Sequence, residues 1–262
     1  MKRVIVPIDF SETSDKIVRT ALQFCLHFNV ELYLLHVFDY THLDLDFNQQ
    51  KVKTEIDFKK KEMGKLVTSI RNDKKYEKIK IVEAFGHGTL VRNLKSLGFQ
   101  SKKDLIVLGI SGEHRLLRRM FGTKWTEIVQ EIENPMFLQP NQLEVDFIKS
   151  IVLGINESTT LNKPTSNLLE SVLSMYNLEV IKLVHVIADF KDDRVDNVVK
   201  KYDLPYTYTE FCDTNISEGL QHFVQRAKDT LLVLKKRTPK LPLQKNIIQE
   251  LTLDAKIPLM IV

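Results

Sequence analysis

Cysteine, glycine and long apolar runs are all scarce in this sequence, and each shortage excludes a class of protein. There are 2 cysteines and 9 glycines among 262 residues. Cys25 and Cys212 lie far apart and outside any Cys-x-x-Cys or Cys/His cluster, so we expect neither a disulfide framework nor a zinc site. No apolar run reaches the roughly 18 residues of a membrane span, and the N-terminus does not resemble a signal peptide. We therefore expect a soluble, cytoplasmic protein without a membrane partner.

An excess of charge of one sign is also missing. The chain has 38 Lys and Arg against 34 Asp and Glu, a formal net charge of +4. The lysines are spread among carboxylates, which is not typical of a dedicated nucleic-acid surface. An apolar fraction of 43% is that of an ordinary globular protein, and the length fits one large or two ordinary domains.

Short apolar runs alternate with longer stretches of helical period. The runs that predict buried strands in the first half are 2–8, 30–38, 79–85, 104–109 and 135–139. The stretches between them that predict helices are 12–28, about 48–72, 89–99 and 125–132. This alternation indicates an α/β fold with an open, doubly wound parallel sheet covered on both faces.

The same pattern occurs a second time. Residues 149–158 resemble 2–11, and the runs 180–186, 229–234 and 257–262 repeat 31–37, 104–108 and 134–139 in the same order. Four matched strands indicate an internal repeat. We predict two tandem five-stranded domains, at 1–140 and 148–262, joined by a polar linker.

Glycines at a defined spacing follow the strand predicted at 104–109. Gly109 and Gly112 are followed after nine residues by Gly122 and Thr123, just before a predicted helix. Glycines let the backbone approach phosphates closely, and a helix N-terminus favours an anion. Ligands of open α/β sheets bind at this edge. An ordinary strand-to-helix turn is the alternative interpretation of the same glycines.

With this spacing, residues 1–140 resemble the ATP-binding universal stress proteins. The other motifs that carry the resemblance are Val-Pro-Ile-Asp-Phe-Ser at 6–11, Leu-His-Val at 35–37, Gly-His-Gly at 86–88 and Asn-Pro-Met-Phe-Leu at 134–138. The resemblance implies an adenine nucleotide alpha hydrolase-like, Rossmann-like fold. It also implies that the last strands of the two domains, 135–139 and 259–262, pair within the chain as in a pseudo-dimer; a homodimer stays open.

The resemblance implies one ATP site, formed by residues that follow the first, second and fourth strands: Pro7, Ile8, Asp9, Val37, Gly109, Gly112, Gly122 and Thr123. Asp9 and the backbone before it would face adenine and ribose, and the backbone of Val37 would meet the adenine edge. The glycines and Thr123 would lie along the ribose and phosphates. Magnesium is expected with the phosphates, although no dense carboxylate cluster would hold it unaided.

Several of these residues have a structural alternative. Asp9 can simply cap the following helix. His36 recurs as His185, which favours a structural role over catalysis. A turn explains Gly-His-Gly at 86–88 about as well as a pocket wall does. The arginines 115, 118 and 119 can reach phosphates or belong to a solvated loop.

The second domain departs from the pattern at the site. Asn156 stands where Asp9 stands in the first, and Gly154 replaces Pro7. No glycine occurs between 220 and 262, and prolines after its fourth strand remove N–H donors. We expect this domain to bind no ATP in the family's manner.

An efficient enzyme is not expected. Lys124 follows Thr123 instead of preceding it as in a P-loop, and no nucleophile–base–orienter set is recognisable. Slow hydrolysis or self-phosphorylation at Thr123 or Ser111 is the most that we expect. The sequence thus favours a stress-response ATP sensor or regulatory module. The alternatives are a nucleotide-independent protein-interaction scaffold and, ranked last, a nucleic-acid binder.

Overall fold

The computed structural model describes residues 1–11, 14–38, 49–96, 103–110, 125–140, 148–156, 159–187, 202–225, 229–236 and 257–262. Contacts divide the chain into two compact units. Apart from Ile110, strands β1–β4 and helices α1–α3 and α5 belong to the first unit, whereas the chain from Pro135 onward belongs to the second.

In the first unit the strands are β1 (Arg3–Pro7), β2 (Glu31–Phe38), β3 (Ile81–His87) and β4 (Asp104–Ile110). They lie in the order β3-β2-β1-β4, and every pair in this order is parallel. The helices are α1 (Ser14–Phe28), α2 (Gln49–Asn72), α3 (Leu90–Ser96) and α5 (Trp125–Glu131). The strands predicted at 2–8, 30–38, 79–85 and 104–109 are therefore confirmed.

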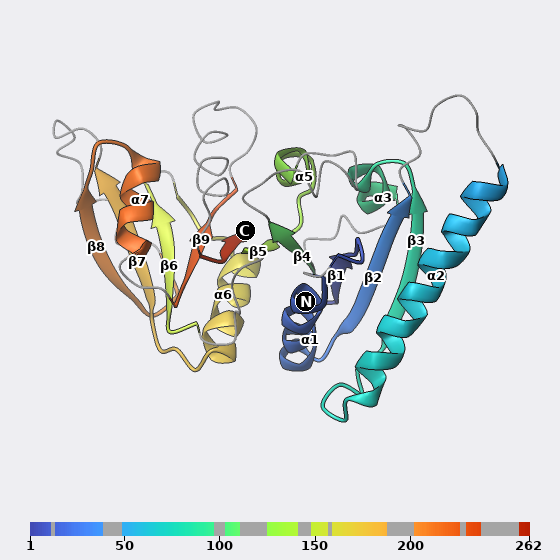
Figure 1. The fold of residues 1–262 in the computed structure, drawn as a ribbon. Coiled ribbons are helices and arrows are strands. Elements are labelled where there is room, and N and C mark those ends of the chain that lie inside the picture. The colour runs from blue at the N-terminus through green and yellow to red at the C-terminus, as the bar shows by residue number, and fades with distance from the viewer. Residues whose placement is uncertain are drawn as a thin grey trace. The chain divides into compact units, whose positions relative to one another are not determined.

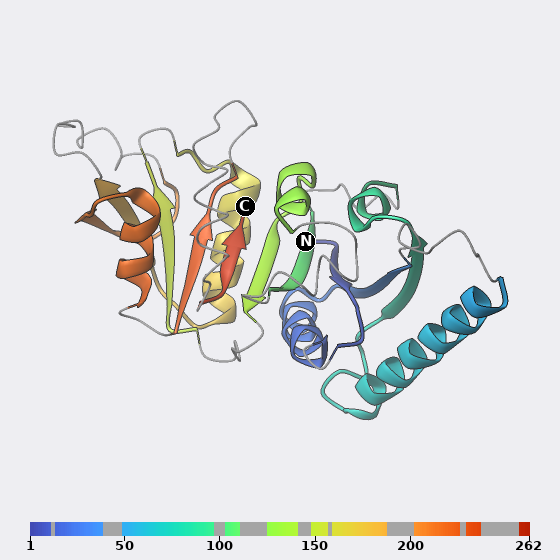
Figure 2. The ribbon, with the colours of Figure 1, turned by 45° about the horizontal axis from the view of Figure 1, so that its top comes forward.

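The helices of the first unit cover both faces of its sheet (Figures 1 and 2). Going from β1 to β2 to β3, the chain moves outward in one direction through α1 and α2. It then returns past β1 to β4 through α3. Because such crossovers are right-handed, the reversal moves the helices to the other face. The doubly wound arrangement expected from the sequence is thus present.

Helix α1 shows why these residues fold in this way. Its inward positions Ile17, Ala21 and Phe24 recur at helical spacing and are at most 4% exposed. At its end, Asn29 adopts a left-handed conformation with φ 51°. The Val30 N–H donates to the Cys25 carbonyl at 3.1 Å, which is the Schellman bond that ends a helix at such a residue.

In the second unit the strands are β5 (Met136–Pro140), β6 (Ser150–Ile155), β7 (Ile181–Ile187), β8 (Tyr206–Cys212), β9 (Thr230–Leu234) and β10 (Leu259–Ile261). Their order is β5-β10-β9-β6-β7-β8. The helices are α6 (Lys163–Met175) and α7 (Ile216–Gln225). The pairs among β10, β9, β6, β7 and β8 are parallel, and β7 and β8 continue the sheet on the side away from β9.

Strand β5 groups with the second unit because it pairs with β10. The pairing is antiparallel, with Met260 opposite Phe137 and Ile261 opposite Met136. The resemblance implied this pairing of 135–139 with 259–262. All five residues of β5 and all three of β10 are buried, as expected for strands with a partner and a covered face.

Helix α6 repeats the ending of α1. Asn177 is left-handed with φ 54°, and the Leu178 N–H donates to the Leu173 carbonyl at 2.9 Å. At the start of α6, the Asn162 side chain accepts from the Thr165 N–H at 3.0 Å, and a proline occupies the first turn. The two units therefore share strand order and helix-end chemistry.

Candidate functional site

The strand order of the first unit reverses at β1, which pairs with β2 on one side and with β4 on the other. This is the point at which open α/β sheets bind ligands. Ile5 pairs with Ile106, and continuing this register puts Ile8 level with Gly109. Two of the predicted site residues are thereby brought together.

Asp9 anchors the turn between β1 and α1. Its Oδ1 accepts from the Ser11 N–H at 2.9 Å, the Ser11 hydroxyl at 2.6 Å and the Ser14 hydroxyl at 2.7 Å. Asp9 thus joins the turn after β1 to the first residue of α1 through the Ser14 hydroxyl, and none of the three bonds comes from a backbone N–H of α1. All three bonds use Oδ1, and within the described ranges no hydrogen bond reaches Oδ2.

His36 supports the same turn from β2. Its Nδ1 lies 2.7 Å from the Ile8 carbonyl oxygen, and the side chain is buried. A carbonyl oxygen only accepts, so Nδ1 carries a hydrogen and donates. Burial is the main cause that lowers the pKa of His36, so the neutral imidazole is favoured. The structural role predicted for His36 is therefore supported by this contact.

Phe10 also lies at this edge of the sheet, and the sequence analysis did not single it out. It has φ 61°, a left-handed conformation that is strained for a bulky residue. Its ring lies 5.0 Å from that of His36, and the Lys59 ammonium of α2 lies 5.1 Å from its centroid. The position of Phe10 between a strand and a helix gave no signal of this conformation, because only the fold brings His36 and Lys59 to it.

The backbone of Val37 faces the side of β2 on which β1 has ended. The Leu32 N–H and the Phe38 carbonyl bond toward β3, whereas the Leu35 carbonyl accepts from Ile8 on the β1 side. Since these directions alternate along a parallel strand, the N–H and C=O of Val37 face the β1 side. No described residue pairs with them there. A neighbouring donor and acceptor are thus available above the end of β1.

The Gly-His-Gly turn at 86–88 is explained by packing. A Cβ on Gly86 would lie 1.9 Å from Asn93 Oδ1, and Gly88 has φ 85°. The Asn93 amide donates to the carbonyls of His87 and Thr89 at 2.9 Å each. Asn93 therefore requires a glycine at 86, and the turn requires one at 88. The turn interpretation accounts for both residues.

The phosphate-binding part of the prediction falls outside the described residues. Gly112, Gly122, Thr123, Ser111 and Lys124, and the arginines 115, 118 and 119, all lie there. Of the predicted site residues, Pro7, Ile8, Asp9, Val37 and Gly109 are described, and they lie at the carboxyl ends of three adjacent strands.

The second unit has different chemistry at the equivalent edge. Asn156 Oδ1 accepts from the Thr159 hydroxyl at 2.9 Å, within the turn that follows β6. Directly after β9, the Lys235 ammonium bonds to the Thr160 carbonyl and, at 3.0 Å, to its hydroxyl. Because β6 and β9 are neighbours, Lys235 spans the carboxyl ends of the two strands between which a nucleotide would enter.

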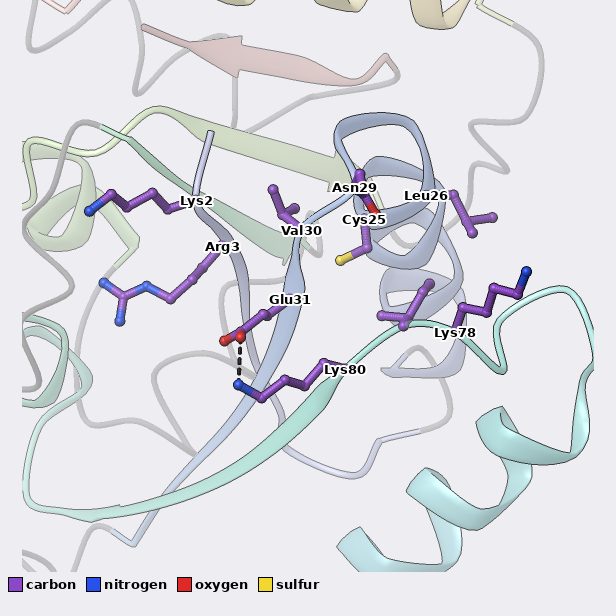
Figure 3. A pocket seen from close by; sticks show the side chains of 10 residues that line it. Lys2, Arg3, Cys25, Leu26, Asn29, Val30, Glu31, Lys78 and Lys80 are labelled. Atoms are coloured by element: carbon purple, nitrogen blue, oxygen red, sulfur yellow. Dashed lines mark hydrogen bonds and ion pairs between the residues drawn. The ribbon is translucent and has the colours of Figure 1, made fainter.

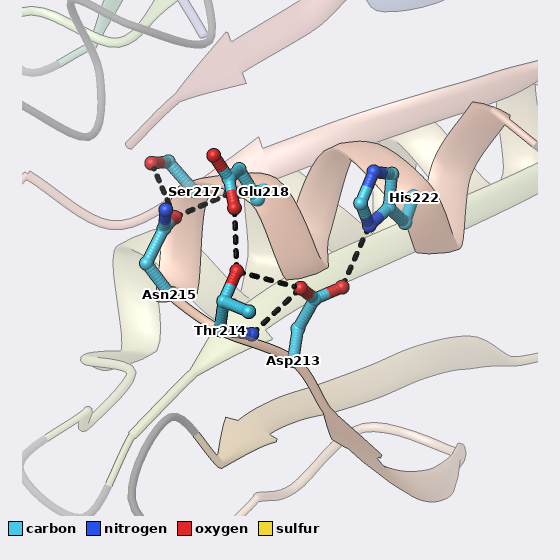
Figure 4. A network of polar contacts seen from close by, with 6 residues as sticks. All are labelled: Asp213, Thr214, Asn215, Ser217, Glu218 and His222. Atoms are coloured by element: carbon cyan, nitrogen blue, oxygen red, sulfur yellow. Dashed lines mark hydrogen bonds and ion pairs between the residues drawn. The ribbon is translucent and has the colours of Figure 1, made fainter.

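A further polar cluster surrounds the start of α7 (Figure 4). Asn215 Oδ1 accepts from the Glu218 N–H at 2.8 Å, and the Thr214 hydroxyl donates to Glu218 at 2.6 Å. Asp213 pairs with His222 Nδ1 at 2.7 Å, a contact that is the main cause lowering the pKa of Asp213. These bonds satisfy the first turn of a helix, so we assign the cluster a capping role.

The described part of the chain contains no group of three or more His, Cys, Asp or Glu side chains placed to hold a metal ion. None of its helices combines the length and the apolar character needed to cross a membrane.

A doubly wound sheet whose strand order reverses at β1 is typical of open α/β proteins with Rossmann-like topology. Residues 1–138, more than half of the chain, match the universal stress protein family. The chain belongs to this family. A search of curated proteins finds no match.

Solved structures agree with the fold over the whole chain. A universal stress protein from Archaeoglobus fulgidus is 15% identical with a TM-score of 0.72, covering 99% of this chain and 95% of its own. A putative universal stress protein from Pseudomonas aeruginosa is 7% identical with a TM-score of 0.61, covering 100% and 93%. At these identities the likeness concerns the fold alone.

Proposed function

We propose that the protein binds one ATP, accompanied by magnesium, at the carboxyl edge of its first unit. The observation that carries the proposal is the backbone of Val37, whose N–H and C=O face the side of β2 on which β1 has ended. An adenine edge offers one acceptor and one donor side by side, which this pair complements. Ile8 and Gly109, level with each other at the two strand ends, would bound the ribose.

The glycine loop would hold the phosphates. Gly112, Gly122 and Thr123 would supply backbone N–H groups and a hydroxyl, and Gly109 lies near the end of β4, just before them in the chain. Asp9 keeps one oxygen, Oδ2, for a ribose hydroxyl or for a water on magnesium, while Oδ1 stays bound to α1. Bound magnesium would neutralise phosphate charge.

We propose a sensor or regulatory role in the stress response, with at most slow hydrolysis. Among the described residues at this edge, Asp9 is bound to the start of α1 and His36 donates to the Ile8 carbonyl, which supports a role for both in positioning the turn after β1. Domains 1–140 and 148–262 would form a tandem pair with a single ATP site. This is supported by their shared strand order and helix ends. We place the protein in the cytoplasm.

The test combines two measurements on the full chain. Small molecules released by denaturing the freshly purified protein are identified by mass spectrometry, and magnesium-ATP is titrated into the stripped protein. We expect about one ATP or ADP per chain and a saturable titration. If no nucleotide is released and the titration does not saturate, the result favours the alternative, a nucleotide-independent interaction scaffold in which Asp9 only holds the turn before α1.

A further inference from the structure

A cavity of about 750 Å³ opens at the amino-end edge of the first unit, the edge away from the proposed ATP site (Figure 3). It lies where β1 and β2 begin, beside the last turn of α1 and the segment that leads into β3. In Figure 3, Lys2 and Arg3 lie on one side, Leu26 and Lys78 on the other, and Cys25 and Val30 between them. The volume is in the range of small-molecule sites.

One wall of the cavity is apolar and held in place. It includes Leu26, Val30 and Ile79, with the buried Cys25 beneath. The Schellman bond from Val30 to Cys25 ties the end of α1 to the start of β2, so these side chains have a defined position. Burial raises the pKa of Cys25 to about 12, which keeps its thiol neutral and the wall uncharged.

The rest of the lining is cationic after its ion pairs are taken into account. Arg3 forms two bonds with the fully buried Asp104, and the Lys80 ammonium contacts Glu31 at 2.5 Å. Lys2 and Lys78 have no carboxylate partner among the described residues. Two uncompensated ammonium groups therefore border an apolar wall.

The surrounding chain adds to this positive charge. Residues 71–80, which form the end of α2 and the turn before β3, contain five Lys and Arg but only two Asp and Glu. This local excess is large beside the formal charge of +4 of the whole chain. A local field of one sign raises the concentration of anions at a concave surface.

The second unit provides an internal comparison, because strand register identifies the corresponding positions. In the strand register, Arg3 of β1 lies opposite Asp104 of β4 and Glu31 of β2. In the second unit, Ser150 of β6 lies opposite Thr230 of β9 and, continuing the register, opposite Val180 before β7. Lys80 and Pro205 correspond, since their carbonyls accept the equivalent bonds from β2 and β7. Lys78 then corresponds to Asp203, and Lys2 to Lys149, which is paired with Asp229 at 2.6 Å. The second unit therefore has an acidic residue where Lys78 stands, and its one equivalent lysine is paired with a carboxylate.

We propose that this cavity binds a small organic anion. An acidic group, either carboxylate or sulfonate, would be attracted by the positive charges of Lys2 and Lys78, which flank the cavity on opposite sides, and an apolar body would cover Leu26, Val30 and Ile79. Binding here is independent of the proposed ATP site, because the two lie at opposite ends of the same strands.

The test uses two fluorescent probes in the presence of saturating magnesium-ATP. One is 8-anilinonaphthalene-1-sulfonate, and the other is N-phenyl-1-naphthylamine, which has the same rings without the charge. We expect saturable binding of the sulfonate at one site, weakened by salt. Replacing Lys2 and Lys78 together by Ala should weaken it about tenfold. The matched double variant Lys65→Ala with Lys163→Ala, away from the cavity, should bind normally.

Two further measurements locate the site. Leu26→Glu adds a negative charge at a position that is 39% exposed, so it should weaken sulfonate binding without unfolding the chain. Amide NMR signals of Val30 and Ile79 should shift with the sulfonate, and that of Gly109 should not. The proposal is overturned by an unchanged affinity in the Lys2/Lys78 variant or by equal losses for both probes. Binding of a hexaglutamate peptide but not of the dye would also overturn it, in favour of an acidic protein partner.

Discussion

The two units of the chain have the same parallel strand order and the same Asn-terminated helices, but their carboxyl edges differ. In the first, His36 donates to the Ile8 carbonyl at 2.7 Å, and the strand register continues to Gly109 beside it. In the second, His185 lies 3.5 Å from the Tyr208 hydroxyl, and Lys235 crosses to Thr160. The strand order and helix ends that both units share are features of the fold. The contacts that occur in only one unit, at its carboxyl edge, are those available for function.

The largest expected effect is the loss of ATP binding on substitution of a glycine in the glycine loop. Gly122→Val introduces a branched side chain where the phosphates are proposed to lie, and we expect ATP binding to fall below detection, a loss of more than about 100-fold. Calorimetric titration of magnesium-ATP measures this. Lys235→Ala in the second unit is the control and should leave binding unchanged. Undiminished binding by the Gly122 variant would remove the site from the first unit.

The second largest effect is expected at the start of the central strands. The first unit has an ion pair there, and the second unit has a pair of hydroxyls at the equivalent positions. Asp104→Asn breaks the contact of a fully buried carboxylate with Arg3 and should lower the free energy of unfolding by about 3 kcal/mol. Thr230→Val removes the 2.7 Å contact with Ser150 and should cost about 1 kcal/mol. Urea unfolding measures both. Equal costs would show that the ion pair contributes no more than the hydroxyls.

The pH dependence of stability should depend on His36. Burial lowers its pKa in the folded state below the value of about 6.5 in the unfolded chain. Between these two pKa values the unfolded chain binds more protons, so stability is full above pH 6.5 and falls as the pH drops through this interval. His36→Asn retains an amide donor for Ile8 but cannot titrate. Urea unfolding between pH 7.5 and 5 should give a smaller slope for the variant, and identical slopes would refute this.

The smallest effect tests the similarity of the two units. Asn29→Ala and Asn177→Ala each force alanine into a left-handed conformation at the end of α1 or α6. We expect each to lower the unfolding free energy by about 1 kcal/mol, and by the same amount within about 0.5 kcal/mol. The matched Gly variants at both positions should retain stability. A cost at only one position would mean that the two helix ends are not equivalent.

Much of the fold was predictable because its strands are buried and its repeat is visible in the sequence. The runs 2–8 and 104–109 contain almost only Val, Ile and Leu, and they form β1 and β4. Strand β8 gave a weaker signal, since it alternates Tyr and Thr at the edge of its sheet and is largely exposed. Its pairing with β7 is a consequence of the tertiary fold.

The site was predictable only in part, because its contacts join distant residues. The bond between His36 and Ile8 spans 28 positions, and that between Lys235 and Thr160 spans 75. The recurrence of a histidine at the end of the second strand of each domain was the one signal for His36. The nucleotide-binding role of Asp9 stays a prediction, and the structure adds its bonds to the Ser11 and Ser14 hydroxyls.

The central claim is that one of the two units binds a nucleotide, and counting bound ATP tests it most directly. Equilibrium dialysis of radiolabelled ATP against the full chain, with magnesium, gives the number bound at saturation. We predict one per chain for the wild type and for Lys235→Ala, and none for Gly122→Val. A value near two, or one that persists in the Gly122 variant, would contradict the assignment of the site to the first unit.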